Sequence, residues 1–212
     1  MPGRVALVID DRLTAISFAP HPLKSKLMKR YKILMELLEK TSLIERVDFV
    51  KPEVANEIIL REAHHLDYID FIKMANAIGI GYVDKGETPI YRGMFEDSLY
   101  IVGATMTAGS IVVSGKYDHV FNPNGGHCHA KYLCASNYNI FNDVAILAKT
   151  LFRKYKWRIL ILDISGTHAD GTQEILYSDP ILKISIHRRD RIYGSARGGF
   201  YEIGDGRGYG YN

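Results

Sequence analysis

Short apolar runs alternate along the chain with longer segments whose apolar residues recur every three or four positions. The short runs are typical of strands buried on both faces, and the long segments have the spacing of helices with one buried stripe. This alternation requires crossover connections and predicts an α/β fold with a mainly parallel sheet and helices on both faces. The predicted strands are residues 5–9, 47–50, 119–122, 158–163 and 181–186. The predicted helices are residues 25–43, 56–77, 94–113 and 142–156, with a further helix starting at Thr172.

The 212 residues contain no internal repeat and no linker rich in Pro, Gly or Ser, so we expect one domain over residues 1–212. A net charge of +3 without a basic stripe argues against direct binding of nucleic acid. The longest weakly polar run, residues 99–113, is too short to cross a bilayer, and we expect neither a membrane segment nor a secretory leader. Two cysteines, Cys128 and Cys134, are too few for a disulfide framework and favour a reducing, cytoplasmic location.

Polar side chains gather where the predicted strands end. Asp10 and Asp11 follow the first strand, residues 122–129 follow the third, residues 163–170 follow the fourth, and His187 follows the fifth. In parallel sheets of α/β proteins, ligands bind beyond the carboxyl ends of the strands. We therefore expect a functional site at this edge of the sheet.

Two of these loops carry the side chains best suited to chemistry. The first contains three adjacent candidates: His127, Cys128 and His129. Histidine can act as base, acid or metal ligand near neutral pH, although a polar loop with incidental histidines has the same composition. A metal site that adds Cys134 is disfavoured, because adjacent residues rarely converge on one ion and the spacing is not a standard zinc pattern. In the second loop, Asp163 and Asp170 either orient the histidines of the first loop or simply end a strand and cap a helix. Their spacing alone does not decide between these interpretations.

The order of motifs resembles the zinc-dependent histone deacetylase family, which includes acetoin-utilisation proteins and acetylpolyamine amidohydrolases. That family has a Gly-Gly-x-His-His-Ala-Lys motif followed by Asp-x-Asp-x-His-His-Gly-Asp-Gly at a strand end. Residues 125–131 (GGHCHAK) resemble the first motif, and residues 163–171 (DISGTHADG) resemble the second. Further matches cover essentially the whole chain: 21–22, 63–69, 135–143, 184–187 and 204–212. The resemblance implies a three-layer arginase/deacetylase-like fold. The chain would hold the N-terminal two-thirds of the family domain and end before its C-terminal third.

The resemblance also assigns functional positions. The family's catalytic histidine–aspartate pairs correspond to Cys128 with Asp163 and to His129 with Asp170, so only the second pair keeps its histidine. The implied pocket contains four further residues: Asp10, His127, Tyr138 and His168. Tyr138 stands at the position of the family's tunnel phenylalanine, and Leu27 replaces an arginine that follows the early His-Pro motif.

Metal binding is where the chain departs furthest from the family. The family's zinc is held by an aspartate and a histidine of the second motif, which here are Ser165 and Thr167, and by a later aspartate outside the matched part. A catalytic zinc needs about three Asp, His or Cys ligands, and neutral hydroxyls are poor substitutes. We therefore expect no zinc and no other cofactor. A weak site for a monovalent cation at Asp163 and Ser185 matches the family's structural cation position.

These departures lead to two main hypotheses. In the first, this is a histone-deacetylase-like protein that is catalytically inactive and acts as a binding or assembly subunit. In the second, it is a zinc-dependent deacetylase that hydrolyses acetyl-amide bonds with ligands supplied by a second polypeptide. A split or decayed reading frame without a function is a third hypothesis. Strand edges near residues 157–162 and 181–186 should be uncovered, which predicts a homo-oligomer or a second subunit.

Overall fold

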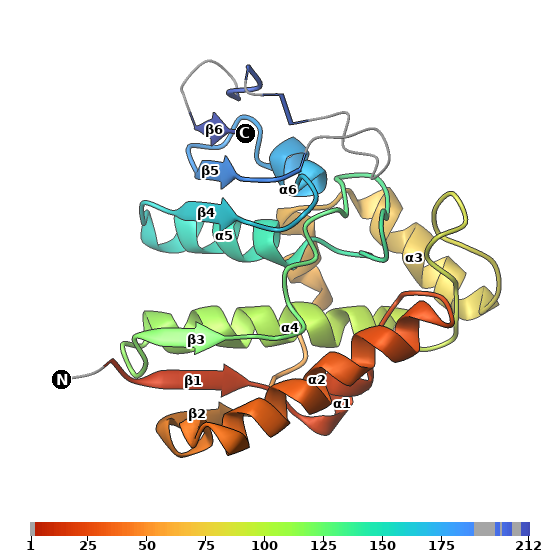
Figure 1. Ribbon diagram of the computed structural model, residues 1–212. Coiled ribbons are helices and arrows are strands. Elements are labelled where there is room, and N and C mark those ends of the chain that lie inside the picture. The colour runs from red at the N-terminus through yellow and green to blue at the C-terminus, as the bar shows by residue number, and fades with distance from the viewer. Residues whose placement is uncertain (1–2, 189–197, 200, 205–208) are drawn as a thin grey trace.

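The computed structural model describes residues 3–188, 198–199, 201–204 and 209–212. Its strands form two three-stranded sheets, in the orders β2-β1-β3 and β4-β5-β6. The first sheet consists of β1 (Val5–Val8), β2 (Val47–Val50) and β3 (His119–Phe121). The second consists of β4 (Leu160–Asp163), β5 (Leu182–Ser185) and β6 (Gly210–Tyr211). Every strand pairing is parallel, and the arrowheads in Figure 1 all point to one side of the molecule. The prediction of a parallel α/β fold is confirmed.

Helices connect the strands and lie on both sides of them. Figure 1 shows α2 in front of β2 and α4 behind β3. The α-helices are α1 (Asp11–Ala15), α2 (Leu23–Lys40), α3 (Leu66–Ile78), α4 (Met94–Val113), α5 (Asp143–Tyr155) and α6 (Asp170–Ile175). Two 3₁₀ helices are η1 (Leu43–Arg46) and η2 (Glu57–Glu62). Among the helices of the described residues, none is long and apolar enough to cross a membrane.

The single helix predicted for residues 56–77 is wrong, because this segment forms η2 and α3 with a break between them. The break has a local cause, since the segment contains two N-cap residues. The Asn56 side chain accepts a hydrogen bond from the Ile58 nitrogen, and the His65 ring accepts one from the Asp67 nitrogen. Each cap satisfies a free N–H group at the start of a new helix, so the apolar spacing alone overestimated the helix length.

The expectation that all strands are buried on both faces is also wrong. Phe121 of β3 is 52% exposed, and Leu160 and Leu162 of β4 are each 55% exposed. Within the described residues, β3 pairs only with β1 and β4 pairs only with β5, so both are edge strands. The apolar sequences of β3 and β4 are typical of central strands. The sequence predicted one sheet, but the described strands form two sheets, with β3 at the edge of the first and β4 at the edge of the second.

The core between the sheets and helices is built around α4. Its buried side chains include Met94, Ile101 and Ala104, which pack with Ile140 and Ile146. The segment after β2 crosses this helix at close range: the Glu53 nitrogen donates to Thr107 Oγ1 at 3.1 Å, and the Ala55 nitrogen donates to the Leu99 carbonyl at 3.2 Å. Gly103 lies under this crossing, where a side chain would meet the crossing backbone.

Replacing Gly103 with alanine should lower the free energy of unfolding by about 1–3 kcal/mol, as overpacking does elsewhere. An added Cβ would lie 1.9 Å from the Glu53 carbonyl oxygen and 2.7 Å from the Ala55 nitrogen, so backbone must move. Urea unfolding followed by circular dichroism measures the change. Gly166→Ala is the matched control, because nothing lies within 4 Å of a Cβ at that position. Equal stability of the two variants would contradict the close crossing.

Candidate functional site

The residues with chemical potential lie in two loops at the carboxyl ends of the strands. The first loop leaves β3 and includes residues 122–131, and the second leaves β4 and includes residues 164–169. Both loops lie on the side of the molecule to which the strand arrows point in Figure 1. The edge of the sheet predicted from the sequence is therefore where these loops meet.

A buried carboxylate at the start of α5 holds the first loop. Asp143 is 0% exposed; its Oδ1 accepts a hydrogen bond from the His127 nitrogen at 2.7 Å, and its Oδ2 accepts one from the Gly126 nitrogen at 3.0 Å. The Thr105 hydroxyl of α4 also donates to Oδ2. A buried carboxylate needs such donors, and meeting this need fixes the backbone just before Cys128.

Asn142, also fully buried, ties the same loop to α6. Its Nδ2 donates to the carbonyls of Cys128 and Ala130 at 3.2 and 3.0 Å, and lies 3.1 Å from Thr172 Oγ1. The Thr172 nitrogen donates to the Cys128 carbonyl as well, at 2.9 Å. At Gly171 a Cβ would lie 2.3 Å from the Ala130 carbonyl oxygen, so only glycine lets α6 approach this closely.

His64, at the break between η2 and α3, is hydrogen-bonded to the C-terminal end of the first loop, at Lys131. The Asn142 nitrogen donates to its Nε2 at 2.9 Å, and its Nδ1 therefore donates to the Lys131 carbonyl, also at 2.9 Å. Burial lowers the pKa of His64 to about 4, against the raising effect of the bond to Lys131. The neutral ring provides one donor and one acceptor, which is what these two backbone groups require.

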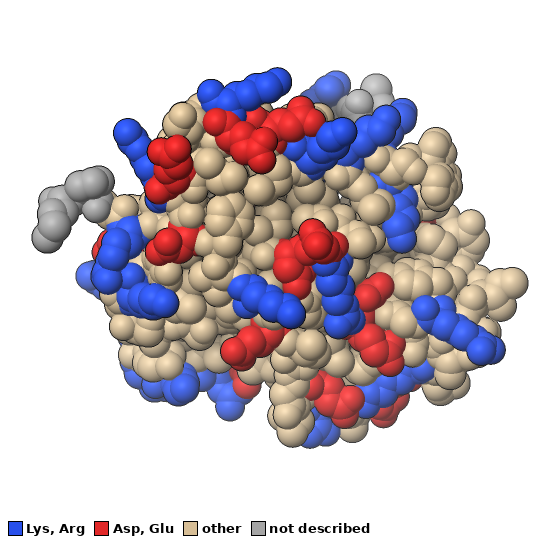
Figure 2. Space-filling model, turned by 90° about the horizontal axis from the view of Figure 1, so that it is seen from below, with Lys and Arg blue, Asp and Glu red and all other residues tan. Residues whose placement is uncertain are grey.

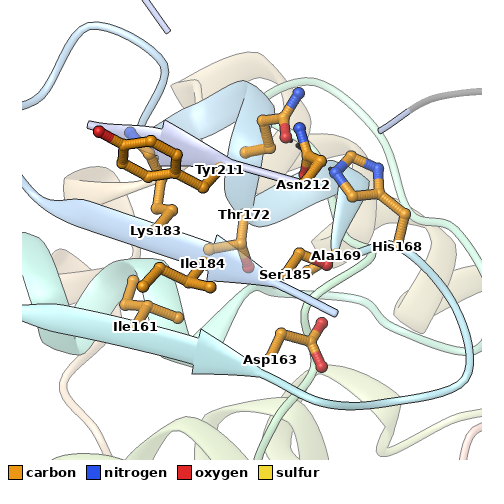
Figure 3. A pocket seen from close by; sticks show the side chains of 11 residues that line it. Ile161, Asp163, His168, Ala169, Thr172, Lys183, Ile184, Ser185, Tyr211 and Asn212 are labelled. Atoms are coloured by element: carbon orange, nitrogen blue, oxygen red, sulfur yellow. Dashed lines mark hydrogen bonds between the residues drawn. The ribbon is translucent and has the colours of Figure 1, made fainter. Parts of the chain in front are cut away.

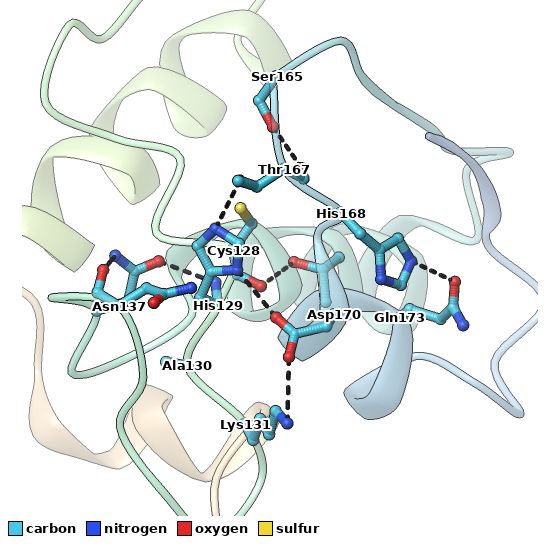
Figure 4. A network of polar contacts seen from close by, with 12 residues as sticks. Cys128, His129, Ala130, Lys131, Asn137, Ser165, Thr167, His168, Asp170 and Gln173 are labelled. Carbon is cyan, nitrogen blue, oxygen red and sulfur yellow. Dashed lines mark hydrogen bonds and ion pairs between the residues drawn. The ribbon is translucent and has the colours of Figure 1, made fainter. Parts of the chain in front are cut away.

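The two loops bring His129 and Asp170 into contact. His129 Nδ1 lies 2.9 Å from Asp170 Oδ1, and Lys131 Nζ lies 3.1 Å from Asp170 Oδ2 (Figure 4). On the other side of the ring, His129 Nε2 lies 3.1 Å from Thr167 Oγ1. The His129 and Asp170 side chains are only 14% and 21% exposed. The structure thus places a histidine and a carboxylate together at the position that the sequence indicated.

The electrostatics of this pair favour an ion pair at neutral pH. Burial lowers the pKa of His129, but hydrogen bonds from its ring to Asp170 and Cys128 outweigh burial and raise the pKa to about 10. Burial raises the pKa of Asp170, while its bonds to His129 and Lys131 lower it further, so the net shift is downward. The carboxylate is therefore charged, and the imidazole carries both of its ring protons.

Ser165 and Thr167, which the resemblance assigns to zinc-ligand positions, are hydrogen-bonded to their own surroundings. Ser165 Oγ donates to the Thr167 carbonyl at 2.8 Å, and Thr167 Oγ1 contacts the His129 ring. Across the described residues, no three His, Cys, Asp or Glu side chains are grouped so that they could hold a metal ion. This donor set does not fit a catalytic zinc, which needs about three such ligands and an open position.

Asp163 and Ser185 line a small cavity between β4, β5 and α6 (Figure 3). Asp163 Oδ1 accepts a hydrogen bond from the Ser165 nitrogen at 2.8 Å, whereas its buried Oδ2 has no hydrogen-bond partner. Ser185 Oγ lies 2.8 Å from His187 Nδ1. The cavity volume is about 20 Å³, which is room for one water-sized particle.

The remaining pocket candidates lie in different surroundings. Asp10 caps α1, accepts a hydrogen bond from the Tyr100 hydroxyl at 2.5 Å, and lines a hollow of about 470 Å³ with residues of α1 and α2. The Tyr138 nitrogen donates to Thr88 Oγ1 at 3.2 Å. His127 lies edge-on to Phe18, and burial lowers its pKa.

His168 points away from His129 in Figure 4, toward Gln173. Its Nε2 lies 2.8 Å from Gln173 Oε1, and its ring lies 4.8 Å from that of His187. It lines a hollow of about 410 Å³ together with Asp170 and Glu202. The pocket candidates named from the sequence therefore do not share one hollow, since Asp10 lines a different one from His168.

Four residues that hold the site were not singled out from the sequence: His64, Asn142, Asp143 and Thr172. For two of them a signal was present, since Asn142 and Asp143 begin the predicted helix at 142–156 and a buried Asn-Asp pair is unusual for a plain helix start. His64 lies within the motif match at 63–69, but its partner Asn142 is 78 residues away, so its contact could not be read from the sequence. Thr172 lies 30 residues from Asn142, and no local pattern indicated that contact.

The stabilising effect of the His129–Asp170 pair should depend on pH. Because the pKa of His129 is raised, its contribution is fully present below the unfolded value of 6.5 and is lost as the pH rises through about 10. We expect the difference in unfolding free energy between wild type and His129→Gln to shrink over this range. Urea titrations at several pH values measure it, with the exposed His119→Gln as control. A difference that stays constant or grows would contradict the ion pair.

Comparison with known proteins places this geometry in a family. Residues 24–212 match the model of the histone deacetylase domain. The chain is 34% identical over 203 residues to the acetoin utilization protein AcuC of Bacillus subtilis, covering 91% of this chain and 51% of that protein. It is 32% identical over 219 residues to AcuC of Staphylococcus aureus strain MRSA252, covering 99% and 55%, and 30% identical over 190 residues to AcuC of Staphylococcus xylosus, covering 86% and 49%. The chain spans about half the length of these relatives. With the parallel α/β fold and the paired motif loops, these matches show that the chain belongs to the histone deacetylase family.

Proposed function

We propose that this member of the family does not hydrolyse amides through zinc on its own and acts as a binding or assembly subunit. One observation carries the proposal: the hydroxyl side chains of Ser165 and Thr167, which the resemblance assigns to metal-ligand positions, are both hydrogen-bonded within the site. Ser165 bonds the Thr167 carbonyl, and Thr167 bonds the His129 ring. Side chains that cannot hold zinc supply neither an activated water nor a polarised carbonyl for amide hydrolysis.

The hollow beside Asp10 supports a binding function. Its volume of about 470 Å³ lies in the range of small-molecule pockets. The lining combines apolar side chains, Met28, Met35 and Phe49, with the polar groups of Asp10 and Tyr31. A small organic ligand with an apolar body and a hydrogen-bond donor suits this lining.

The cavity at Asp163 supports the weak cation site. The unpartnered Oδ2 of Asp163 is a buried oxygen ligand, and Ser185 supplies a second oxygen to the same cavity. Hard monovalent cations such as potassium or sodium accept oxygen ligands of this kind. Such an ion would stabilise the loop after β4 without taking part in chemistry.

The free edges of β3 and β4 support an interaction with another polypeptide, either a second copy or a different subunit. Unpaired strand edges and exposed apolar side chains favour pairing with a second chain. Phe121, Leu160 and Leu162 provide the apolar surface, and Ile164, 74% exposed, extends it. A stable interface here should bury upwards of about 1,000 Å² in total.

The surface charge supports a partner other than nucleic acid. Figure 2 shows acidic and basic side chains interspersed over the visible face, without a continuous basic stripe. The small number of cysteines, Cys128 and Cys134, is too low for a disulfide framework and supports a cytoplasmic location, because reducing compartments keep thiols reduced.

Metal analysis of the purified protein tests the proposal. After incubation with zinc and dialysis, wild type should retain no stoichiometric zinc and should release no acetate from an acetyl-lysine peptide. The double variant Ser165→Asp/Thr167→His, which restores two ligand types, should compete better for zinc against a chromophoric indicator. Ser165→Ala/Thr167→Ala is the matched control. Stoichiometric zinc in wild type that this control abolishes would contradict the proposal, and zinc binding only with a co-purified subunit would support the second hypothesis.

Light scattering tests the partner. At high micromolar concentration the chain should be an oligomer or carry a co-purified subunit, and Leu162→Lys should reduce the associated fraction because an edge charge opposes strand pairing. Ile33→Lys on α2 is the matched control, since Ile33 and Leu162 are 54% and 55% exposed. A soluble wild-type monomer would overturn this part of the proposal.

A further inference from the structure

The replacement of a histidine by Cys128 puts a thiol directly beside the retained imidazole. Cys128 and His129 are neighbours in the chain, and the loop turns both side chains to the same region, with the sulfur beside the His129 ring in Figure 4. Interaction with Cys128 is also one of the causes that raise the pKa of His129, as expected for a sulfur next to the ring. A thiol in hydrogen-bond reach of an imidazole is the first requirement for an activated sulfur nucleophile.

The second requirement is a group that orients the imidazole, and Asp170 meets it. The bond of 2.9 Å between His129 Nδ1 and Asp170 Oδ1 leaves Nε2 on the side of the ring that faces the thiol and Thr167. Lys131 Nζ holds the other carboxylate oxygen at 3.1 Å, which fixes Asp170 in turn. Nucleophile, base and orienting carboxylate therefore follow one another in a chain of contacts, an arrangement that recurs on unrelated folds.

The charge of the ring suits this arrangement. A protonated imidazole carries a positive charge and can donate a proton to a leaving group as it departs. With a pKa of about 10, His129 carries that positive charge at neutral pH and keeps a proton on Nε2 for transfer.

Exposure and the neighbouring groups single out the sulfur. Cys128 is partly exposed, whereas Ala130 and Asn142 are 0% exposed. Ser165 Oγ donates to a carbonyl within its own loop. Thr167 has an alcohol on a branched carbon, which is a weaker nucleophile at neutral pH than a thiol.

We propose that Cys128, His129 and Asp170 form a nucleophilic thiol site that accepts an acyl group from an activated donor, an ester or a thioester. The sulfur attacks the acyl carbonyl carbon, and the bond from that carbon to the leaving oxygen or sulfur breaks. The leaving group takes the proton that His129 Nε2 already carries, and the proton of the thiol replaces it on the ring, so the imidazole ends the step in the state in which it began. The product is an acyl thioester on Cys128, formed without an oxidant, a reductant or a metal ion. The site goes beyond the proposed binding function and does not depend on it.

Acetylation by p-nitrophenyl acetate in the presence of a chelator tests the site. The second cysteine, Cys134, is an internal control, because it is exposed and trypsin cleavage after Lys131 separates the two cysteines. After an acid quench, peptide mass spectrometry gives the rate of acetylation at each cysteine. Cys128 should be acetylated at least about tenfold faster than Cys134. A positioned acid–base group raises reaction rates by about a hundredfold or more, so tenfold is a low threshold.

Variants of His129 and Asp170 then measure how much each residue contributes to the acetylation rate at Cys128. His129→Gln should slow acetylation of Cys128 at least about tenfold and leave Cys134 unchanged, and Asp170→Asn should slow it less. Cys134→Ser and His119→Gln are controls that should leave the rate at Cys128 unchanged. Circular dichroism checks that each variant is folded. The ratio of the acetylation rates at Cys128 and Cys134 is measured in wild type and does not depend on any variant.

Three outcomes would overturn the proposal: equal rates at the two cysteines in wild type, an unchanged Cys128 rate in folded His129→Gln, or acetyl groups found on Thr167. Loss of reactivity on chelation would also contradict it, because the step uses no metal. Zinc binding by wild type would contradict the proposed function instead, so the two proposals fail by different results.

Discussion

The buried carboxylate of Asp143 is the constraint on which the site depends. With no exposure to solvent, it must find its hydrogen-bond donors inside the protein, and it takes them from α4 and from two backbone N–H groups of the loop after β3. These hydrogen bonds fix the backbone of the glycine-rich loop after β3, which we call the platform of the site. Asn142 extends the platform to α6, and the directions of the side chains at 128 and 129 follow from it.

This platform carries the loops whose motifs resemble those of the family. The carboxylate Asp170 and the histidine His129 are in contact, as the resemblance implied. Ser165 and Thr167, which the resemblance assigns to metal-ligand positions, form hydrogen bonds within the same site. The proposed loss of zinc chemistry therefore rests on the chemistry of these two side chains and not on a disrupted loop structure.

Periodicity and strand order were enough to predict the parallel α/β fold, whereas the pairing of His129 with Asp170 was implied only by the resemblance to the family. Parallel strands present their carboxyl ends at one edge, so residues far apart in sequence become neighbours. The uncovered edges expected near residues 157–162 and 181–186 followed from the resemblance and not from apolar content, because Leu160 and Leu162 look the same in a central strand. Within the described residues β4 does lie at an edge, whereas β5 is paired on both sides, with β4 and β6. The strand β6 has only two residues and therefore contains no apolar run that could predict it. The position of His64 depends on Lys131 and Asn142, which lie 67 and 78 residues away in sequence.

The division of the strands into two sheets has a consequence for how the protein forms during synthesis. In the described part of the chain, β2-β1-β3 is complete by residue 121, and β4-β5-β6 uses only residues 160–211. Each sheet can therefore close its own loops without waiting for the other, and the first can form while the second is still being translated. The loop that carries Cys128 cannot, because Thr105 anchors it from the first half and Thr172 from the second. Its final geometry appears only when both halves have docked, which makes the site the last part of the described structure to assemble.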